Sequence, residues 1–190
     1  MGIRSLDPPL RKAVFLDRDG VLNRALVRGG KPYPPSTLAE FEILPEAFEA
    51  VSLLRRCGFW LCVVTNQPDV ARGTQELSVV ESMHATLLQA LPLDGVHVCY
   101  HDDADRCGCR KPNPGMLLTA AAKHRISLPD SYMIGDRWRD IDCGHAANCT
   151  TIFIDRGYEE SLRKRPHFQV PDVLAAAHVI CSIQGGQITL

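Results

Sequence analysis

The sequence predicts an α/β protein with a doubly wound, mostly parallel sheet, and three observations lead to this prediction. Short apolar runs typical of buried strands alternate along the chain with segments whose apolar residues have helical spacing. Charged and polar residues follow directly after the strand-like runs, where open α/β sheets bind their ligands. The chain has 190 residues, of which 45% are hydrophobic and 23% charged, and this suits a single globular domain over residues 1–190.

The first half of the chain holds three expected strands and two expected helices. Residues 13–17 (AVFLD) form an apolar run that ends in charged residues and glycine, which indicates a buried strand. Residues 46–56 carry apolar side chains at helical spacing, and a Cys-Gly pair ends this helix. Residues 60–65 (WLCVVT) predict a second buried strand, residues 77–91 a second amphipathic helix, and residues 96–100 a third strand.

The alternation resumes in the second half, after a short segment rich in cysteine. Residues 114–123 begin with proline, which the first turn of a helix accepts. Residues 132–135 predict a strand, residues 139–147 a helix, residues 151–155 a strand and residues 171–183 a last helix. Alternating strands and helices imply parallel strands covered by helices on both faces.

The charge and the lengths of the apolar runs restrict the class of partner. The net charge is −1, so no global field draws the protein to nucleic acid or to an anionic membrane. The N-terminus has no apolar run of signal-peptide length, and no later run reaches the roughly 20 residues of a membrane span. We therefore expect a cytoplasmic protein, and a monomer because no heptad pattern suggests otherwise.

The eight cysteines fall into two groups. In a cytoplasmic protein they argue against a disulfide scaffold, and five of them lie in apolar segments where we expect small buried hydrophobic residues: Cys57, Cys62, Cys143, Cys149 and Cys181. The others form a C-x-H-x₅-C-x-C pattern of Cys99, His101, Cys107 and Cys109. Four such ligands complete a tetrahedral zinc site, which predicts structural Zn²⁺ in a loop at residues 99–109. A redox-active set of cysteines is the alternative.

Reactive side chains follow four of the expected strands. They are D-R-D-G at residues 17–20, T-N-Q at 65–67, R-K at 110–111 and G-D at 135–136, with Asp140 four residues further on. Two carboxylates from one strand end and a third from another make an oxygen-only site suited to Mg²⁺. A calcium loop is excluded because Gly20 is the fourth residue counted from Asp17, not the sixth, and Arg28 stands where the twelfth position needs glutamate.

Such a site fits the attack of a carboxylate on a phosphate ester. Like charges about 4 Å apart near a protein surface repel by on the order of 4 kcal/mol, so a divalent ion and a lysine must offset the repulsion. The metal, Lys111 and backbone N–H groups would stabilise the charge on the phosphoryl oxygens. A covalent aspartyl-phosphate would divide the transfer to water into two easier steps.

The segments FLDRDGVLN, VVTNQ, CRKPNPGM and MIGDRWRD resemble, in this order, the four motifs of the haloacid-dehalogenase (HAD) superfamily of phosphatases, over residues 13–157. The resemblance implies that Asp17 is the nucleophile. Asp19 would protonate the leaving oxygen and then activate water as a general base. Thr65 would hydrogen-bond the transferring phosphoryl group, and Lys111 would pair with that group and with Asp17.

The same resemblance implies a magnesium site. Asp136 would bind Mg²⁺ alongside Asp17 and the main-chain carbonyl of Asp19. Asp140 would support this site, unless it is a solvent-facing residue in the first turn of its helix. The gaps between the first three motifs are short, so the resemblance implies no large cap domain.

The zinc loop resembles that of two phosphatase groups within the superfamily. One hydrolyses D-glycero-D-manno-heptose 1,7-bisphosphate, an intermediate for surface polysaccharide, and the other hydrolyses histidinol phosphate. Heptose enzymes typically carry NQSGIARG after the second motif, and NQPDVARG ends in the same Ala-Arg-Gly. This favours the 7-phosphatase acting in lipopolysaccharide biosynthesis. Arg72 and Arg110 would then bind the phosphate that is not cleaved, and we also assign Asn66 to substrate binding.

Two departures from the pattern leave the sugar, its anomer and its phosphate position open: Pro68-Asp69 replaces Ser-Gly, and Tyr100 replaces proline. Residues 29–35 (GGKPYPP) form a rigid loop that is a further candidate for lining the pocket. A histidinol-phosphate or other small sugar-phosphate phosphatase is the alternative enzyme. A zinc-bearing interaction module with an inactive phosphatase fold is the alternative from another class. Inactive forms usually lose the nucleophile or a metal-binding carboxylate, whereas this sequence keeps Asp17, Asp19, Lys111 and Asp136.

Overall fold

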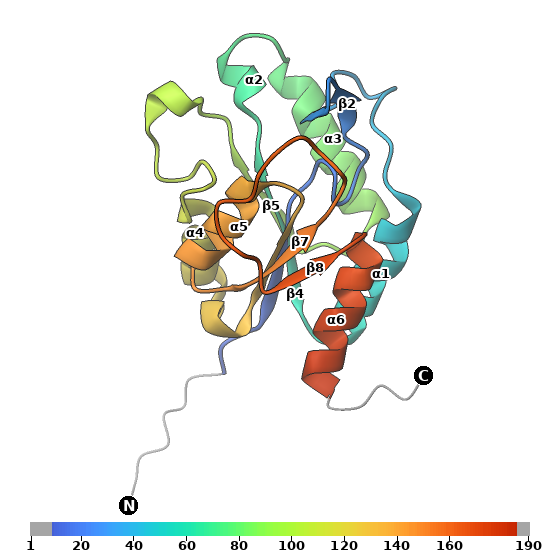
Figure 1. The fold of residues 1–190 in the computed structure, drawn as a ribbon, viewed down its shortest axis with the longest axis vertical. Coiled ribbons are helices and arrows are strands. Elements are labelled where there is room, and N and C mark those ends of the chain that lie inside the picture. The colour runs from blue at the N-terminus through green and yellow to red at the C-terminus, as the bar shows by residue number, and fades with distance from the viewer. Residues whose placement is uncertain (1–8, 186–190) are drawn as a thin grey trace, which may run out of the picture.

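The computed structural model describes residues 9–185, in which six strands form one parallel sheet in the order β5-β4-β1-β6-β7-β8 (Figure 1). The strands of this sheet are β1 (Ala13–Leu16), β4 (Trp60–Asn66), β5 (Gly95–Cys99), β6 (Tyr132–Gly135), β7 (Thr150–Ile154) and β8 (Phe168–Val170). The helices are α1 (Pro45–Arg56), α2 (Pro68–Ala71), α3 (Leu77–Ala90), α4 (Gly115–His124), α5 (Trp138–Ala146) and α6 (Val173–Gly185). The predicted doubly wound α/β fold is therefore confirmed.

Helices cover both faces of the sheet, and each face has its own apolar core (Figure 1). In β1, Val14 and Leu16 pack into the core shared with α1 and α6, whereas Ala13 and Phe15 pack into the core shared with α4. Successive side chains of a strand point to opposite faces, so a strand covered on both faces must be apolar throughout. This explains why the strand-like segments are continuous apolar runs instead of alternating ones.

The register of the central strands brings the reactive segments to one edge of the sheet. Leu16, at the end of β1, pairs with Val63 of β4 and Ile134 of β6. The residues that follow these three strands therefore meet, as expected at the carboxyl ends of parallel strands. The zinc loop, residues 99–109, leaves the neighbouring strand β5 at the same edge.

Four short strands and helices were absent from the sequence prediction: β2, β3, α2 and β8. β8 has one buried side chain in three residues, which is too few positions for a periodic pattern to show. The hairpin of β2 (Leu26–Arg28) and β3 (Lys31–Tyr33) turns at Gly29 and Gly30, which both have positive φ angles. Helix α2 is a single turn that begins at the proline of the NQPDVARG segment. The ends of all ten predicted elements lie within two residues of the observed ones.

The expectation of five unpaired buried cysteines is wrong for two of them. Cys57, at the end of α1, forms a disulfide with Cys181 of α6, with the Cα atoms 6.1 Å apart. The two residues are 124 positions apart in the chain, and only the packing of α1 against α6 brings them together. Because this pairing depends on tertiary structure, the local apolar context of each cysteine gave no sign of it. Cys62, Cys143 and Cys149 are buried and free, as predicted.

The segment between β1 and β4 holds only the β2–β3 hairpin and α1, so the described residues include no large cap domain. Two 3₁₀ turns, η1 (Asp103–Asp105) and η2 (Leu128–Asp130), complete the elements. Within residues 9–185, no helix combines the length and the apolar character needed to cross a membrane.

Candidate active site

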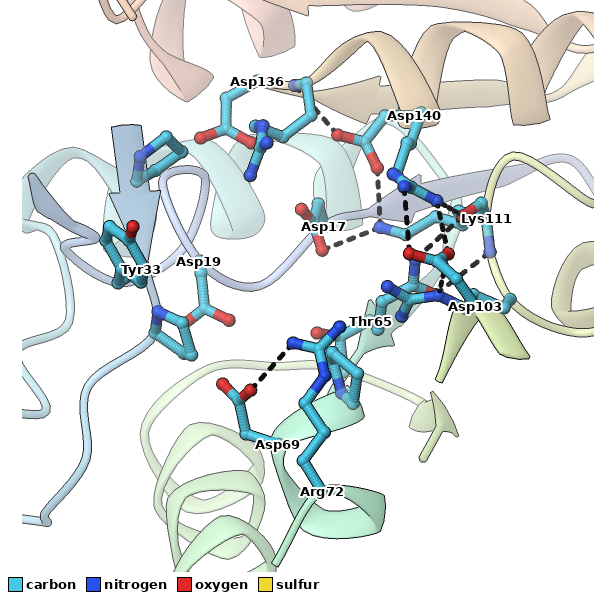
Figure 2. A pocket seen from close by; sticks show the side chains of 17 residues that line it. Asp17, Asp19, Tyr33, Thr65, Asp69, Arg72, Asp103, Lys111, Asp136 and Asp140 are labelled. Atoms are coloured by element: carbon cyan, nitrogen blue, oxygen red, sulfur yellow. Dashed lines mark hydrogen bonds and ion pairs between the residues drawn. The ribbon is translucent and has the colours of Figure 1, made fainter. Parts of the chain in front are cut away.

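A pocket of about 330 Å³ opens at the carboxyl ends of β1, β4 and β6 (Figure 2). All the predicted catalytic and substrate-binding residues line it: Asp17, Asp19, Thr65, Asn66, Arg72, Arg110, Lys111, Asp136 and Asp140. The β2–β3 hairpin also contributes, through Pro32, Tyr33 and Pro34. The loop at residues 29–35 therefore lines the pocket.

Lys111 is the central cation of the pocket and is almost completely buried. Its Nζ atom donates to Asp17 Oδ1 at 2.8 Å, to Asp140 Oδ1 at 2.6 Å and to the carbonyl oxygen of Val64 at 2.8 Å. Burial lowers the pKa of Lys111, but the charges of Asp140 and Asp17 outweigh burial and raise the pKa above its usual value. Lys111 is therefore a fixed positive charge directly beside Asp17.

Asp17 and Asp136 are the two pocket carboxylates whose pKa values are raised by burial. Burial raises the pKa of Asp17 from 3.8 to about 7, against the opposing charge of Lys111. Burial and the charges of Asp17 and Asp140 also raise the pKa of Asp136 well above its usual value. Both carboxylate oxygens of Asp136 are buried, and the hydroxyl of Tyr158 beside them offsets the rise only in part. Unpaired buried carboxylates are costly, and a bound cation would remove the cost.

The backbone next to these carboxylates is shaped for close approach. Gly20 has a φ of +81°, and a Cβ atom there would lie 1.9 Å from Asp136 Oδ2. Glycine is therefore required for two reasons, the left-handed backbone and the contact. Oxygen atoms of Asp17, Asp136 and Asp140 lie within 4.8 Å of one another. Asp140 already accepts from Lys111 and from the backbone N–H of Arg137 at 3.0 Å, which leaves Asp17 and Asp136 facing the gap. These hard oxygen ligands fit Mg²⁺.

The raised pKa values predict that Mg²⁺ binding strengthens as pH rises. Between pH 3.8 and about 7, Asp17 is protonated in the folded, metal-free protein but ionised in the unfolded chain. The free energy of unfolding of the metal-free protein therefore falls as the pH rises through this range. Mg²⁺ needs the ionised carboxylate, and each pH unit below about 7 costs about 1.4 kcal/mol of binding free energy per proton displaced. We expect Mg²⁺ to raise the melting temperature more at about pH 8 than at about pH 6. An equal rise at both pH values would contradict this.

Asp19 is held rigidly by donors from three side chains. Its carboxylate accepts from Arg18 Nη2 at 3.0 Å, from Asn23 Nδ2 at 3.0 Å and from Gln67 Nε2 at 2.9 Å. Arg18 is fully buried, and its Nη1 atom donates to His84 Nε2 at 3.2 Å. Burial and the charge of Arg18 lower the pKa of His84 to about 4, so this imidazole is neutral and accepts the hydrogen bond. Arg18 and Gln67 stand inside the quoted motifs, but their spacing alone did not show that they orient Asp19.

Thr65 and Asn66 use their side chains in different ways. Thr65 is buried, and its hydroxyl accepts a hydrogen bond from Gln67 Nε2 at 2.9 Å. Asn66 binds the backbone of Lys111 twice: its Oδ1 accepts from the N–H, and its Nδ2 donates to the carbonyl oxygen, both at 3.0 Å. The amide of Asn66 thus fixes the position of Lys111, and its assignment to substrate binding stays a prediction.

Arg72 and Arg110 approach the pocket from different segments. Arg72 is half-exposed and pairs with Asp102 at 2.5 Å and with Asp69 at 3.1 Å. The Arg110 side chain is 10% exposed, and its Nε donates to Asp103 at 2.8 Å. Its Nη1 atom is buried without a partner. Arg139, which the sequence did not single out, also pairs with Asp103, at 3.1 Å.

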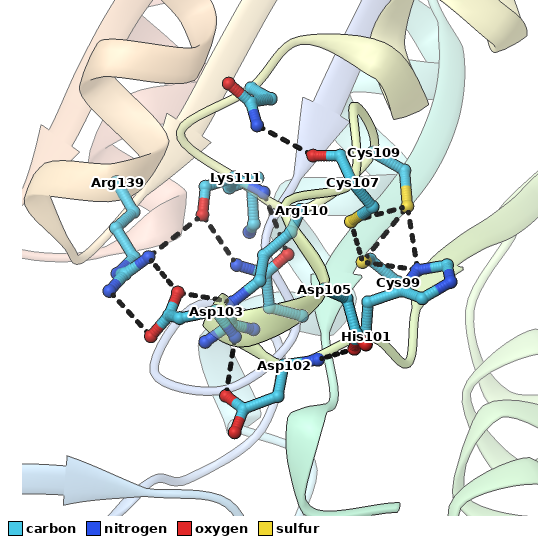
Figure 3. Close-up of polar contacts among 12 residues, drawn as sticks. Cys99, His101, Asp102, Asp103, Asp105, Cys107, Cys109, Arg110, Lys111 and Arg139 are labelled. Carbon is cyan, nitrogen blue, oxygen red and sulfur yellow. Dashed lines mark hydrogen bonds and ion pairs between the residues drawn. The ribbon is translucent and has the colours of Figure 1, made fainter. Parts of the chain in front are cut away.

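The four predicted zinc ligands converge at one point (Figure 3). The Sγ atom of Cys99 lies 3.1 Å from that of Cys109 and 3.6 Å from that of Cys107, and His101 Nδ1 lies 3.3 Å from Cys109 Sγ. All three cysteines are free in the structure. Three sulfurs and one imidazole nitrogen facing one another are the donor set of a closed zinc site. The segment continues directly into Arg110 and Lys111, so this cluster fixes where both cations begin.

Comparison with known proteins identifies similar enzymes. A family model described as HAD-hydrolase-like matches residues 108–177. The chain is 34% identical over 152 residues to the D-glycero-beta-D-manno-heptose-1,7-bisphosphate 7-phosphatase of Pseudomonas aeruginosa, covering 77% of this chain and 83% of that protein. It is 31% identical over 195 residues to the D-glycero-D-manno-heptose-1,7-bisphosphate 7-phosphatase of Thermosynechococcus vestitus, covering 90% and 96%.

A solved structure shows the same fold. The crystal structure of D,D-heptose 1,7-bisphosphate phosphatase from B. bronchiseptica, complexed with magnesium and phosphate, matches with a TM-score of 0.77 and 26% identity. The match covers 90% of this chain and 99% of that chain.

Proposed function

Because the chain belongs to the D-glycero-D-manno-heptose-1,7-bisphosphate 7-phosphatase family of HAD-like hydrolases, we propose that it releases the 7-phosphate of a heptose bisphosphate through a phospho-aspartate on Asp17. The chain is a phosphatase, and the assignment of each residue's role is our proposal. The observation that carries it is the buried Asp17–Lys111–Asp140 arrangement beside the buried carboxylate of Asp136, which has no cation paired with it among the described residues.

In the first step, a carboxylate oxygen of Asp17 attacks the phosphorus atom, and the bond from phosphorus to the sugar oxygen breaks. Asp19 gives its proton to the leaving oxygen. Lys111 and the hydroxyl of Thr65 hold the phosphoryl oxygens, so that charge developing on them meets fixed donors. Mg²⁺, bound by Asp17, Asp136 and the carbonyl of Asp19, would neutralise charge on the phosphoryl group.

In the second step, Asp19 takes a proton from water, and the water oxygen attacks the phosphorus of the phospho-aspartate. The bond from phosphorus to Asp17 breaks, which releases inorganic phosphate and restores the carboxylate. The donors around Asp19 suit this double role because Arg18, Asn23 and Gln67 keep its carboxylate in one position while it gains and loses a proton.

The same proposal extends to features that support the site. Cys99, His101, Cys107 and Cys109 would bind a structural Zn²⁺, since their donor atoms converge and leave no open position for substrate. Arg72 and Arg110 would bind the second phosphate. We further propose that residues 1–190 form one domain, that the enzyme is a cytoplasmic monomer, and that its product serves lipopolysaccharide biosynthesis.

A substrate panel tests the proposed function. Phosphate release is measured with Mg²⁺ for both anomers of heptose 1,7-bisphosphate, for histidinol phosphate and for simple sugar monophosphates. We expect kcat/KM to be highest for a heptose bisphosphate, by about tenfold or more, because a second phosphate pairs with buried arginine. A preference for histidinol phosphate would overturn the substrate assignment, and no turnover of any compound would favour a non-catalytic zinc module.

A further inference from the structure

Two neighbouring carboxylates at the tip of the zinc loop pair with three of the four arginines that line the pocket. Figure 3 shows Asp103 beside Arg110 and Arg139. Asp102 pairs with Arg72, and Asp103 pairs with both Arg110 and Arg139. Each of the three arginines therefore already has an anion that comes from the protein itself. The fourth arginine of the lining, Arg137, pairs with Glu160 instead.

The contacts of Asp103 leave the arginine pair incompletely satisfied. Asp103 Oδ1 accepts from Arg110 Nε at 2.8 Å and from Arg139 Nη1 at 3.1 Å, and Asp103 Oδ2 accepts from Arg139 Nη2 at 3.4 Å. The Nη1 atom of Arg110 is buried and has no partner. A carboxylate has two oxygens to offer, whereas a phosphate ester has three in a tetrahedral arrangement. A phosphate would thus satisfy this pair more completely than Asp103 does.

The two arginines are fixed in place, and Asp103 is the exposed partner. Arg110 is 10% exposed, while the side chain of Asp103 is 55% exposed. Arg139 also donates to the carbonyl oxygen of Lys111 at 3.4 Å and lies over the ring of Trp138, 4.8 Å from its centroid. The Asp103 side chain is thus the most exposed of the three, since the Arg139 side chain is 29% exposed.

We propose that Asp103 is an internal anion that occupies the Arg110–Arg139 pair in the free enzyme and is displaced by the phosphate of the substrate that is not cleaved. This inference rests on the proposed function. Asp103 makes ion pairs with both guanidinium groups, at 2.8 Å and 3.1 Å, and so occupies the place of an external anion. A phosphate dianion carries more charge than Asp103 and replaces it. Chloride or a single carboxylate group carries no more charge than Asp103 and offers fewer acceptor oxygens than a phosphate.

The displacement makes a definite prediction for Asp103→Asn. Removing the competing anion should lower KM for heptose 1,7-bisphosphate by about threefold to tenfold. The compound p-nitrophenyl phosphate has a single phosphate and cannot reach both Asp17 and the arginine pair. The fold-change in its KM should therefore be smaller than that for the bisphosphate, by a factor of about three or more. In an Arg139→Gln background, the effect of Asp103→Asn on the bisphosphate should shrink, because half of the contested pair is gone.

Asp105→Asn is the matched control, because it removes the same charge from the same loop. Asp105 accepts the backbone N–H of Asp102 at 2.7 Å, a bond that an asparagine oxygen can also accept, and it contacts no arginine in the described structure. We expect its KM values for both compounds to stay within about twofold of the parent. Melting curves of all variants establish that they are folded.

The outcomes separate this inference from the proposed function. A rise in the bisphosphate KM of Asp103→Asn would mean that Asp103 aligns the arginines for substrate, which overturns displacement. The inference is also overturned if Asp103→Asn changes the KM of both compounds equally, or if Asp105→Asn changes the bisphosphate KM as much as Asp103→Asn does. Either result would mean that only the overall negative charge of the loop affects KM. If the parent enzyme hydrolyses p-nitrophenyl phosphate but not the bisphosphate, the proposed substrate fails before Asp103 is tested.

Discussion

Asp17→Asn is expected to lower phosphate release from heptose 1,7-bisphosphate by about 10⁴-fold or more. An amide oxygen does not form the phospho-enzyme, and the ion pair with Lys111 at 2.8 Å is lost. The fold should survive, because the substitution removes one of the three buried carboxylates that lie within 4.8 Å of one another. The melting temperature of the metal-free protein should therefore stay equal or rise.

Single-turnover phosphate release measures the expected loss of activity, and thermal melting measures the expected retention of the fold. Glu49→Gln, which makes the same change of charge at an exposed position of α1, is the control for activity. Asp17→Ala should be measured beside Asp17→Asn, because deamidation of asparagine would regenerate the parent residue. Residual activity above about 1% in the alanine variant would show that another group is the nucleophile.

Cys109→Ser is expected to release the zinc and to destabilise the loop that leads into the active site. Cys109 lies 3.1 Å from Cys99 and 3.3 Å from His101, so its loss removes a donor at the centre of the cluster. Free energy of zinc binding contributes directly to folding. For a domain of this size, a loss of about 3 kcal/mol corresponds to a fall of roughly 6–12 °C in melting temperature. Activity should also fall, because Arg110 and Lys111 follow Cys109 directly.

Metal content is the decisive readout for the zinc site. Freshly purified, reduced parent protein should contain about one equivalent of zinc, and Cys109→Ser should contain far less. Cys149→Ser is the matched control: Cys149 is buried away from the cluster, so its substitution affects packing but should leave zinc bound. Parent protein with less than a few tenths of an equivalent, or zinc retained in Cys109→Ser, would contradict the site.

The sequence predicted those parts of the site that depend on strand order alone. Asp17, Thr65 and Asp136 each follow or end a buried strand, and parallel strands bring such residues together whatever the side-chain details. The four zinc donors were also predictable, because their spacing within eleven residues restricts them to one loop. In each case the information is local, and the fold class supplies the remainder.

What the sequence did not predict depends on contacts between distant segments. Asn66 hydrogen-bonds the backbone of Lys111, which lies 45 residues away in the chain. Nothing in the sequence around Asn66 distinguishes this role from a contact with substrate. Asp103 and Arg139 meet only because the zinc loop and the start of α5 are neighbours in the folded protein. Arginine and aspartate at exposed-looking positions are common, so pairing them required the three-dimensional structure.

The disulfide between Cys57 and Cys181 closes the chain into a covalent ring, and this divides the catalytic residues into two sets. The ring carries Lys111 and Asp136, together with all strands of the main sheet except β1. Asp17 and Asp19 follow β1 and so lie outside the ring. β1 sits between two strands of the ring, β4 and β6. A backbone cut in the β2–β3 hairpin would therefore leave the nucleophile on a separate peptide, joined to its lysine and metal carboxylate only through noncovalent contacts: sheet hydrogen bonds, the apolar core and side-chain pairs such as Asp17 with Lys111.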